Sequence, residues 1–292
     1  MISHKNVLWT IESLFGQMIP ATKFPRIVSY LPMAHIAARS GDHYQAIYRI
    51  GQIFPVPVLE DMKDALPTIK PSVFLAVPRV WEKFKAGLEA KIEENPKKDL
   101  IAKAIKNGLE KVDYEQKGES VPFMIGVKHK VFSKLVFSKF KEGLGIVDTE
   151  YFVTAAAPMN KDVHRWFHAI GIDVTEIYGM TEDTGPATIG VPGNAVESFS
   201  KRLKADSIEV PSVLNPIGKV GIPIPGTEVK VMEDGELCIK GNHVAQGYYK
   251  SDEQTKETFD SEGWLHTGDL AEIDSEGYVK IIGRKKEILI TS

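Results

Sequence analysis

Short apolar runs alternate with helix-length stretches over the first 190 residues of the chain. The apolar runs lie at residues 27–31, 53–58, 73–77, 151–156 and 172–177, and helical stretches lie at 35–50, 79–94 and 161–170. Strands separated by helices at this interval form βαβ units, whose strands lie parallel in one sheet. Ser3 is a candidate N-cap for a helix that runs to about residue 18. We therefore predict an α/β fold, a mostly parallel sheet with flanking helices, over residues 1–190.

The pattern changes after residue 191. Strand-like runs become short and are separated by turns at residues 233–235 and 274–277. A single helix is indicated at residues 251–254, where Ser251 and Gln254 have the spacing of a capping box. Residues 191–283 are predicted to form a β-rich, barrel-like subdomain.

Composition narrows the class of protein. The 292 residues are 43% hydrophobic and 26% charged, which is typical of a globular chain, and the formal net charge of −3 argues against a nucleic-acid binder. The one cysteine, Cys238, is flanked by Leu237 and Ile239, so a buried, inert thiol is favoured over a nucleophile. A single cysteine is also typical of a reducing compartment, and we expect a cytoplasmic location. No run approaches the roughly 20 apolar residues that a membrane-spanning helix needs.

Three segments offer the groups that a bound nucleotide needs, at residues 178–182, 267–270 and 283–287. Tyr178 has an aromatic face for a base, and Thr181 and Glu182 have a hydroxyl for a phosphate and a carboxylate for a divalent cation. Asp269, next to a glycine, can accept bonds from ribose hydroxyls, and the Arg284 guanidinium can reach sugar or phosphate oxygens. The order and spacing of the segments make the combined pattern specific.

Each segment also has a structural interpretation. Tyr178 could be an ordinary buried aromatic at a strand end, and Asp269 is a favoured turn residue. Thr181 could cap a helix. Small residues at 155–158 allow a flat base to approach the backbone, although a tight strand-to-helix turn would use the same residues.

Further segments, together with these three, carry a family resemblance. They are residues 29–35, 77–83, 154–158, 235–241 and 247–249. The chain resembles the AMP-forming acyl-CoA synthetases of the adenylate-forming superfamily, over essentially its whole length. It is most similar to the long-chain and very-long-chain branch, particularly the bubblegum-type enzymes. The resemblance implies the large N-terminal domain of these enzymes, with ATP, Mg²⁺, CoA and a fatty acid as the molecules that the whole enzyme uses.

The resemblance also assigns roles to residues. Thr181 would donate to the α-phosphate, Glu182 would hold Mg²⁺, and His35 would act near the acyl carboxylate and the CoA channel. Val77 and Pro78 would line the acyl pocket, and Lys286 falls on the hinge position. The nucleotide contacts would be Ala156, Ala157, Pro158, Tyr178, Gly179, Met180, Thr181, Asp269, Ile281 and Arg284.

Three positions depart from the family pattern. The family often has glycines at the first two positions of the segment that reads Ala155-Ala156-Ala157-Pro158 here. Arg39 stands where some long-chain relatives have a tryptophan that closes the fatty-acid tunnel, so closure must differ in this chain.

The resemblance further indicates a piece of a longer enzyme. A glycine-rich phosphate loop would precede residue 1, and residues 284–292 would be the hinge and the start of a mobile C-terminal domain. We expect the 292-residue chain alone to show little ATP–pyrophosphate exchange. An acyl-AMP ligase that serves a carrier protein, and an inactive nucleotide- or lipid-binding fragment, are the alternatives to an acyl-CoA synthetase.

A lysine-rich segment and a pair of histidines each have two interpretations. Residues 127–141 contain five lysines and no acidic residue, interleaved with apolar residues, so this helix either packs on the core or lies on an anionic membrane. Core packing is favoured, with peripheral membrane contact as a second role. His164 and His168 are four residues apart, but the glutamate of a metalloprotease helix is missing between them, which argues against a zinc site.

Overall fold

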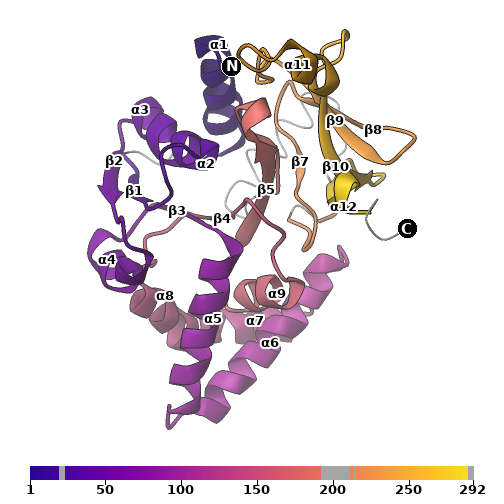
Figure 1. Cartoon of the computed structure of the whole chain (residues 1–292). Coiled ribbons are helices and arrows are strands. Elements are labelled where there is room, and N and C mark those ends of the chain that lie inside the picture. Colours follow the sequence, from indigo (N-terminus) through magenta and orange to yellow (C-terminus); the bar gives the residue numbers. More distant parts are fainter. Residues whose placement is uncertain (20–23, 192–210, 214, 289–292) are drawn as a thin grey trace.

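A seven-stranded sheet forms the centre of the first part of the chain (Figure 1). The computed structural model describes residues 1–19, 24–191, 211–213 and 215–288. The strand order is β2-β1-β3-β4-β5-β6-β7. The strands are β1 (Arg26–Ser29), β2 (Gln52–Pro55), β3 (Val73–Ala76), β4 (Tyr151–Thr154), β5 (Val174–Met180), β6 (Gly185–Ile189) and β7 (Ile222–Pro223).

The prediction of a mostly parallel sheet is confirmed. Strands β1 to β5 pair in parallel, and β6 and β7 are added antiparallel at the β5 edge. The carboxyl ends of β1, β3, β4 and β5 therefore meet at one edge of the sheet, which is where ligands bind in open α/β sheets.

Both faces of this sheet are covered. Side chains alternate along each strand, so neighbouring residues pack into clusters on opposite faces. Phe74 on β3 faces a core cluster that includes Trp81 and Phe167, from helices on one side. Val73, the preceding residue, faces a second cluster with Leu14 and Phe15 on the other side. Figure 1 shows α1 to α3 on one side of these strands and α4 to α9 on the other.

Helices form in or close to the predicted stretches 3–18, 35–50, 79–94 and 161–170, whereas the helix at residues 62–69 was not predicted. The helices are α1 (His4–Ile11), α2 (Ile36–Ala38), α3 (Gln45–Arg49), α4 (Met62–Ile69), α5 (Pro78–Glu93), α6 (Lys98–Gln116), α7 (Phe123–Phe132), α8 (Ser138–Leu144) and α9 (Lys161–Ala169). Wider π-helical turns continue or link them at η1 (Glu12–Met18), η2 (Arg39–Tyr44) and η4 (Ser133–Phe137), and a 3₁₀ turn, η3 (Leu59–Asp61), precedes α4. The predicted N-cap is confirmed, since the Ser3 side chain accepts from the backbone N–H of Asn6.

A second, antiparallel sheet confirms the β-rich part of the chain. Its order is β11-β10-β9-β8, from β8 (Glu228–Val231), β9 (Glu236–Lys240), β10 (Leu265–Ile273) and β11 (Val279–Arg284). Its core residues, such as Leu237 and Val279, share a cluster with Ala187 on β6. This contact places the second sheet beside the end of β5. Strand β7, although it follows residue 191, belongs to the first sheet, and the predicted domain boundaries stay predictions.

One predicted local contact is wrong. Helix α11 (Asp252–Thr258) forms where expected, but the Ser251 side chain accepts no bond from the helix backbone. Its hydroxyl instead donates to Gln254 Oε1 at 3.1 Å, so the capping box is absent. The last described helix, α12 (Lys285–Ile288), directly follows β11.

Candidate functional site

The carboxyl ends of β1, β4 and β5 bring three predicted segments to one edge of the sheet. His35 follows β1, residues 155–158 follow β4, and the 3₁₀ turn η5 (Thr181–Asp183) follows β5. Because β4 and β5 are paired in parallel, with Thr154 opposite Glu176, the alanines after β4 lie beside the Tyr178 segment. Ala156, Ala157, Pro158 and Thr181 are exposed there and accessible to a ligand.

Gly179 is required by a close approach of two backbones. It lies opposite Pro186 on β6, and a Cβ at this position would be 1.8 Å from the carbonyl oxygen of Gly185. No side chain fits in that gap. The glycine therefore keeps β6 tight against β5 and leaves the exposed side of the strand open next to the Tyr178 ring.

Tyr178, Asp269 and Arg284 converge, although the three residues come from β5, β10 and β11. The Tyr178 hydroxyl donates to Asp269 Oδ2 at 2.7 Å, and Arg284 Nε lies 3.2 Å from Asp269 Oδ1. Asp269 and Arg284 are also direct partners in the β10–β11 ladder. Tyr178 lies near the end of β5, three residues before Thr181, so its hydrogen bond to Asp269 joins the second sheet to the strand that leads into the Thr181 turn.

The Asp269 carboxylate is well placed to bind a diol. Its side chain is 7% exposed, whereas that of Arg284 is 68% exposed. Burial, followed by the charge of Asp269, raises the pKa of Tyr178, so the phenol keeps its proton and remains a donor. A carboxylate has about four acceptor positions, of which these two contacts use two. The remaining positions can accept bonds from ribose hydroxyls.

Glu182 is oriented by a residue that sequence reasoning missed as a site residue. The Tyr248 hydroxyl donates to Glu182 Oε1 at 2.8 Å, and the backbone N–H of Ala245 donates to the Glu182 carbonyl at 2.7 Å. Tyr248 lies in the segment 247–249 that contributed to the family resemblance, and that was the only sequence signal for it.

Asp183 was also missed, and it fixes the turn itself. Its Oδ1 accepts from the backbone N–H groups of Met180 and Gly185, at 2.9 and 3.2 Å. The side chain is fully buried, and burial raises the pKa of this carboxyl well above its ordinary value. Asp183 thus closes the turn that presents Thr181 and Glu182, and it faces away from solvent.

The donor set fits a magnesium ion shared with phosphates. Within the described ranges, no three His, Cys, Asp or Glu side chains form a group that could hold a metal alone. Mg²⁺ is commonly held by one or two carboxylates together with substrate phosphates and water. Glu182 is half-buried, and its second carboxylate oxygen can supply the protein's share of such a site.

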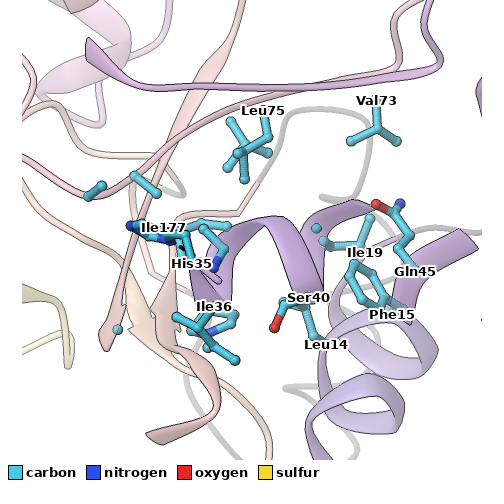
Figure 2. Close-up of a pocket in the computed structure, with 18 residues that line it drawn as sticks. Leu14, Phe15, Ile19, His35, Ile36, Ser40, Gln45, Val73, Leu75 and Ile177 are labelled. Carbon is cyan, nitrogen blue, oxygen red and sulfur yellow. Dashed lines mark hydrogen bonds between the residues drawn. The ribbon is translucent and has the colours of Figure 1, made fainter. Parts of the chain in front are cut away.

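An apolar cavity opens at the same edge of the sheet. The space between atoms in this region is about 690 Å³, a volume that includes open solvent at the mouth of the cavity. Figure 2 shows side chains from the sheet, among them Leu75 and Val73, facing Phe15 and Leu14 from η1. Ala155, Ala156, Gly179 and His35 also line the cavity. The predicted nucleotide segments therefore form part of the wall of an apolar cavity.

His35 lies at the cavity wall as the N-cap of α2. Its Nδ1 accepts from the backbone N–H of Ala37 at 3.1 Å, so in this arrangement the neutral ring carries its proton on Nε2. Arg39 lies one turn further on, and its Nε donates to the Met33 carbonyl at 2.9 Å. The arginine side chain is thereby directed to the backbone of the loop after β1.

The remaining predicted site residues lie apart from the cavity. Val77 packs against the core on the helical side of the sheet, and Pro78 is buried at the first turn of α5, so neither is among the residues that line the cavity. Their role in acyl binding stays a prediction. Ile281 packs in the same cluster as Tyr178 and Met180. Lys286 is exposed on α12.

Lys285, the neighbour of Lys286, is bound to the second sheet. Its Nζ lies 3.0 Å from Glu236 Oε2 and 2.5 Å from Asp234 Oδ2. The hydrogen bonds with these two carboxylates raise the pKa of Lys285 to about 12. In this arrangement the segment after β11 is attached to β9 and its preceding turn.

The two histidines of α9 and the cysteine have structural partners. Both His164 Nε2 and His168 Nε2 lie against the carbonyl of Val174, at 2.7 and 3.0 Å. Cys238 is buried as predicted, and burial raises the pKa of its thiol to about 11.

Comparison with known proteins identifies the family of the chain. The model of a family described as AMP-binding enzyme matches residues 1–249. The fadD11 protein of Mycobacterium tuberculosis, provisionally named a fatty-acid–CoA ligase, is 35% identical over 100% of this chain and 48% of its own length. The human long-chain-fatty-acid–CoA ligase ACSBG2 is 31% identical over 100% of this chain and 42% of its own length. The chain thus spans about half the length of these curated relatives.

Solved structures show the same fold. The N-terminal domain of FACL13 from Mycobacterium tuberculosis has a TM-score of 0.62 at 22% identity. The match covers 96% of this chain and 56% of the FACL13 chain. O-succinylbenzoate coenzyme A synthetase of Bacillus subtilis, in complex with AMP, has a TM-score of 0.62 at 16% identity, and covers 98% of this chain and 46% of its own. By its family match, its relatives and its fold, the chain belongs to the AMP-binding enzymes, the adenylate-forming family.

Proposed function

We propose that this chain forms the adenylate- and acyl-binding part of an ATP-dependent fatty acyl-CoA synthetase that acts on long-chain fatty acids. In the proposed reaction, a fatty acid carboxylate attacks the α-phosphorus of ATP and releases pyrophosphate, which gives acyl-AMP. The thiol of CoA then displaces AMP to give acyl-CoA.

One observation carries this proposal. The apolar cavity is lined in part by Ala155, Ala156 and Gly179, which belong to the predicted adenine-binding segments, and by His35. An acyl adenylate has an apolar chain joined to a nucleotide, so its site needs an apolar cavity that ends at a nucleotide-binding surface. Here the two surfaces share the same residues.

The residues divide the work by chemistry. The face of Tyr178 would carry the adenine, and Asp269 with Arg284 would hold the ribose. Thr181 would donate to the α-phosphate, where negative charge develops in the transition state. Glu182 would hold Mg²⁺, and a magnesium ion bound there supplies positive charge that offsets the charge on the leaving pyrophosphate.

His35 is assigned to the junction between chain and nucleotide. Its imidazole lies in the cavity wall beside the alanine segment, where the acyl carboxylate would be, and its Nε2–H can donate to a carboxylate oxygen. Holding carboxylate and phosphate in a fixed relative orientation accounts for much of the rate in a reaction of this kind.

The long-chain preference is proposed from the lining. Leu14, Phe15 and Ile19 from η1 and its end face Leu75 and Val153 from the sheet, and these residues offer an acyl chain only apolar contacts. Each buried methylene contributes about 0.8 kcal/mol. Affinity for an acyl chain should therefore increase with chain length until the cavity is filled.

Binding of stable acyl-adenylate analogues tests the proposal on the chain itself. We expect titration calorimetry to show that palmitoyl sulfamoyl adenosine binds more tightly than the acetyl analogue and more tightly than AMP. Asp269→Ala should lower the affinity for all three ligands by roughly 10- to 100-fold, because the variant loses hydrogen bonds to a charged group. The control, Asp252→Ala, removes an exposed carboxylate from α11 and should bind as wild type.

Distinct results would refute distinct parts. Equal binding of the Asp269 variant and wild type would remove the ribose assignment, and equal affinity for acetyl and palmitoyl analogues would remove the acyl cavity. For the complete reaction, incubation with fatty acid, ATP and Mg²⁺ in the presence of either CoA or a carrier protein identifies the acceptor. Acyl transfer to the carrier protein alone would overturn the CoA ligase proposal.

A further inference from the structure

Helix α7 carries an exposed apolar stripe. Phe123 is 81% exposed, Met124 58%, Val127 39% and Val131 49%, and Leu135 in the following η4 segment is 62% exposed. Scattered exposed apolar residues are common on proteins, but a contiguous set on one element marks an interaction surface.

Helical geometry puts these side chains on one side. At about 100° per residue, Phe123, Val127, Val131 and Met124 fall within an arc of roughly 100°. On the same scale Lys128 and Lys130 flank the arc, one on each side. Lys128, Lys130 and Lys134 are all exposed. The stripe is therefore an apolar band bordered by cations.

The stripe is separate from the face that packs on the core. Phe132, Val136, Phe137 and Phe140 belong to the core cluster on the helical side of the sheet, and His129 is buried. The predicted core packing of residues 127–141 is thus confirmed for one face. The second face, which begins upstream at Phe123, is left without apolar partners of comparable burial.

Four of the five lysines on this segment lie without a carboxylate partner among the described residues, whereas Lys141 interacts with the charge of Asp173. Residues 123–141 include five lysines and no aspartate or glutamate. Among the described residues, Lys128, Lys130, Lys134 and Lys139 have no carboxylate within ion-pair distance. A nearby anionic surface would therefore gain from these ammonium groups without competition from an internal partner.

We propose that this face of α7 and η4 docks the protein on an anionic lipid bilayer. Apolar side chains would enter the headgroup region while the flanking lysines contact anionic headgroups, as in interfacial amphipathic helices. A protein partner fits less well, because lysine is depleted in protein–protein interfaces. Among the described residues no helix has the length and apolar character to cross a bilayer.

This inference goes beyond the proposed function. The stripe lies in the helical layer on one side of the sheet, and the apolar cavity lies on the other, against η1 and η2. The surface would attach the protein where fatty acids dissolve, without forming part of the acyl site. Its test needs no catalysis, so it can fail while the synthetase proposal stands.

Vesicle flotation tests the proposal with the whole chain. We expect flotation with phosphatidylcholine vesicles that contain phosphatidylglycerol, much less with phosphatidylcholine alone, and loss of flotation near 1 M salt, where the screening length falls to about 3 Å. Replacing Lys128, Lys130 and Lys134 with Gln should lower the partition coefficient about 100-fold, at roughly fivefold per lysine. Replacing Phe123, Val131 and Leu135 with Gln should lower it at least about tenfold.

Matched controls separate a specific surface from general stickiness. Lys5, Lys63 and Lys256 are exposed lysines on other helices, and their replacement with Gln should leave flotation within about twofold of wild type. Leu8→Gln with Ile47→Gln removes exposed apolar side chains elsewhere and should also have no effect. Circular dichroism and urea midpoints verify folding of each variant.

Three results would overturn the proposal. They are no flotation of wild type on anionic vesicles, unchanged flotation of the stripe variant, and a concentration-dependent dimer in light scattering that only the stripe variant abolishes. The last result would mean that a second copy of the chain covers this face.

Discussion

Asp42 is a buried carboxyl beside the apolar cavity. It lies on η2 between residues that line the cavity, and its residue surface is 3% exposed. Burial raises the pKa of Asp42 from 3.8 to about 6, although a hydrogen bond with the Ser29 side chain lowers it. Folding therefore makes the Asp42 carboxyl harder to ionise than it is in the unfolded chain.

The sign of the resulting pH dependence follows from this shift. Because the folded pKa lies above the unfolded pKa, the contribution of Asp42 to stability is complete below pH 3.8 and is lost as the pH rises through about 6. Asp42→Asn should thus become more stable relative to wild type between pH 4 and 7, by up to about 3 kcal/mol. Urea unfolding at each pH measures this difference.

Asp61→Asn is the control for Asp42, since it removes an exposed carboxylate from a nearby turn. Its difference from wild type should stay flat over the same pH range. A flat profile for Asp42→Asn as well would show that the carboxylate at 42 is solvated or paired in the folded protein.

Ala156 shows what a motif can and cannot reveal about one residue. Its φ is +74°, in the left-handed region that L-residues avoid at a cost of roughly 1–2 kcal/mol. The sequence identified this segment as a close approach for a base, and a glycine at this position would adopt the same φ without that cost. Nothing in the sequence showed that this alanine holds the strained conformation while it lines the apolar cavity.

The turn η5 is the element that presents Thr181 and Glu182, the proposed contacts of the phosphate and of Mg²⁺. Residues 180–185 close on the buried Asp183 carboxyl, and the loop that carries Tyr248 holds Glu182 from outside. Contiguous motifs such as residues 178–182 can be read from a sequence. The Tyr248–Glu182 bond joins residues 66 positions apart, and only the packing of the second sheet beside β5 creates it.

The variants Glu182→Ala and Tyr248→Phe distinguish the role of the Glu182 carboxylate from that of the tyrosine that orients it. Both variants lose the same hydrogen bond, so both should lose about 1 kcal/mol of unfolding free energy. Only Glu182→Ala removes the carboxylate, so only it should abolish the Mg²⁺-dependent part of the affinity for a non-hydrolysable ATP analogue. Titration of the analogue with and without Mg²⁺ makes the comparison.

If the affinity for the ATP analogue depended on Mg²⁺ equally in Glu182→Ala and Tyr248→Phe, the assignment of Glu182 as the magnesium ligand would be contradicted. Tyr249→Phe provides the background, because that neighbouring tyrosine is 72% exposed.

Secondary structure was predictable where periodicity was clear. The five parallel strands and the long helices α5 and α9 lie close to their predicted ranges. Helix α4 was missed because Pro67 lies inside it, and a proline normally indicates a helix end. The π-helical windings of η1, η2 and η4 were also missed, because a wider turn leaves no distinct mark in an amphipathic pattern.

At the scale of the whole molecule, the apolar cavity is a product of topology. Its walls come from η1, α2, η2, α3 and the four strands β3 to β6, which are far apart in the sequence and meet only when the sheet is covered on that face. Val77 was predicted to line it, and alternation from Leu75 would have supported this. Strand β3 ends at Ala76, however, and Val77 then packs on the opposite side.

Gly41 offers a way to fill the cavity without disturbing its walls. It lines the cavity on η2, and a Cβ added there would meet only Leu75 Cδ1, at 3.4 Å, an ordinary contact. A leucine at 41 would extend into the space that an acyl chain needs. Gly87 on α5 is the matched control, since a Cβ there has no atom within 4 Å and it lies in the other helical layer.

Gly41→Leu should shorten the acyl chain that the site accepts. With wild type and Gly87→Leu, affinity for acyl sulfamoyl adenosines should increase about fourfold per methylene until the cavity is filled. With Gly41→Leu the increase should stop several methylenes earlier, while affinity for the acetyl analogue stays unchanged, because the nucleotide end of the site is untouched. If all three proteins reached the same plateau, the acyl chain would have to bind elsewhere, since the introduced side chain can reach only this cavity. An equal loss for acetyl and palmitoyl analogues would instead indicate a displaced η2 and leave the cavity without support as the acyl site.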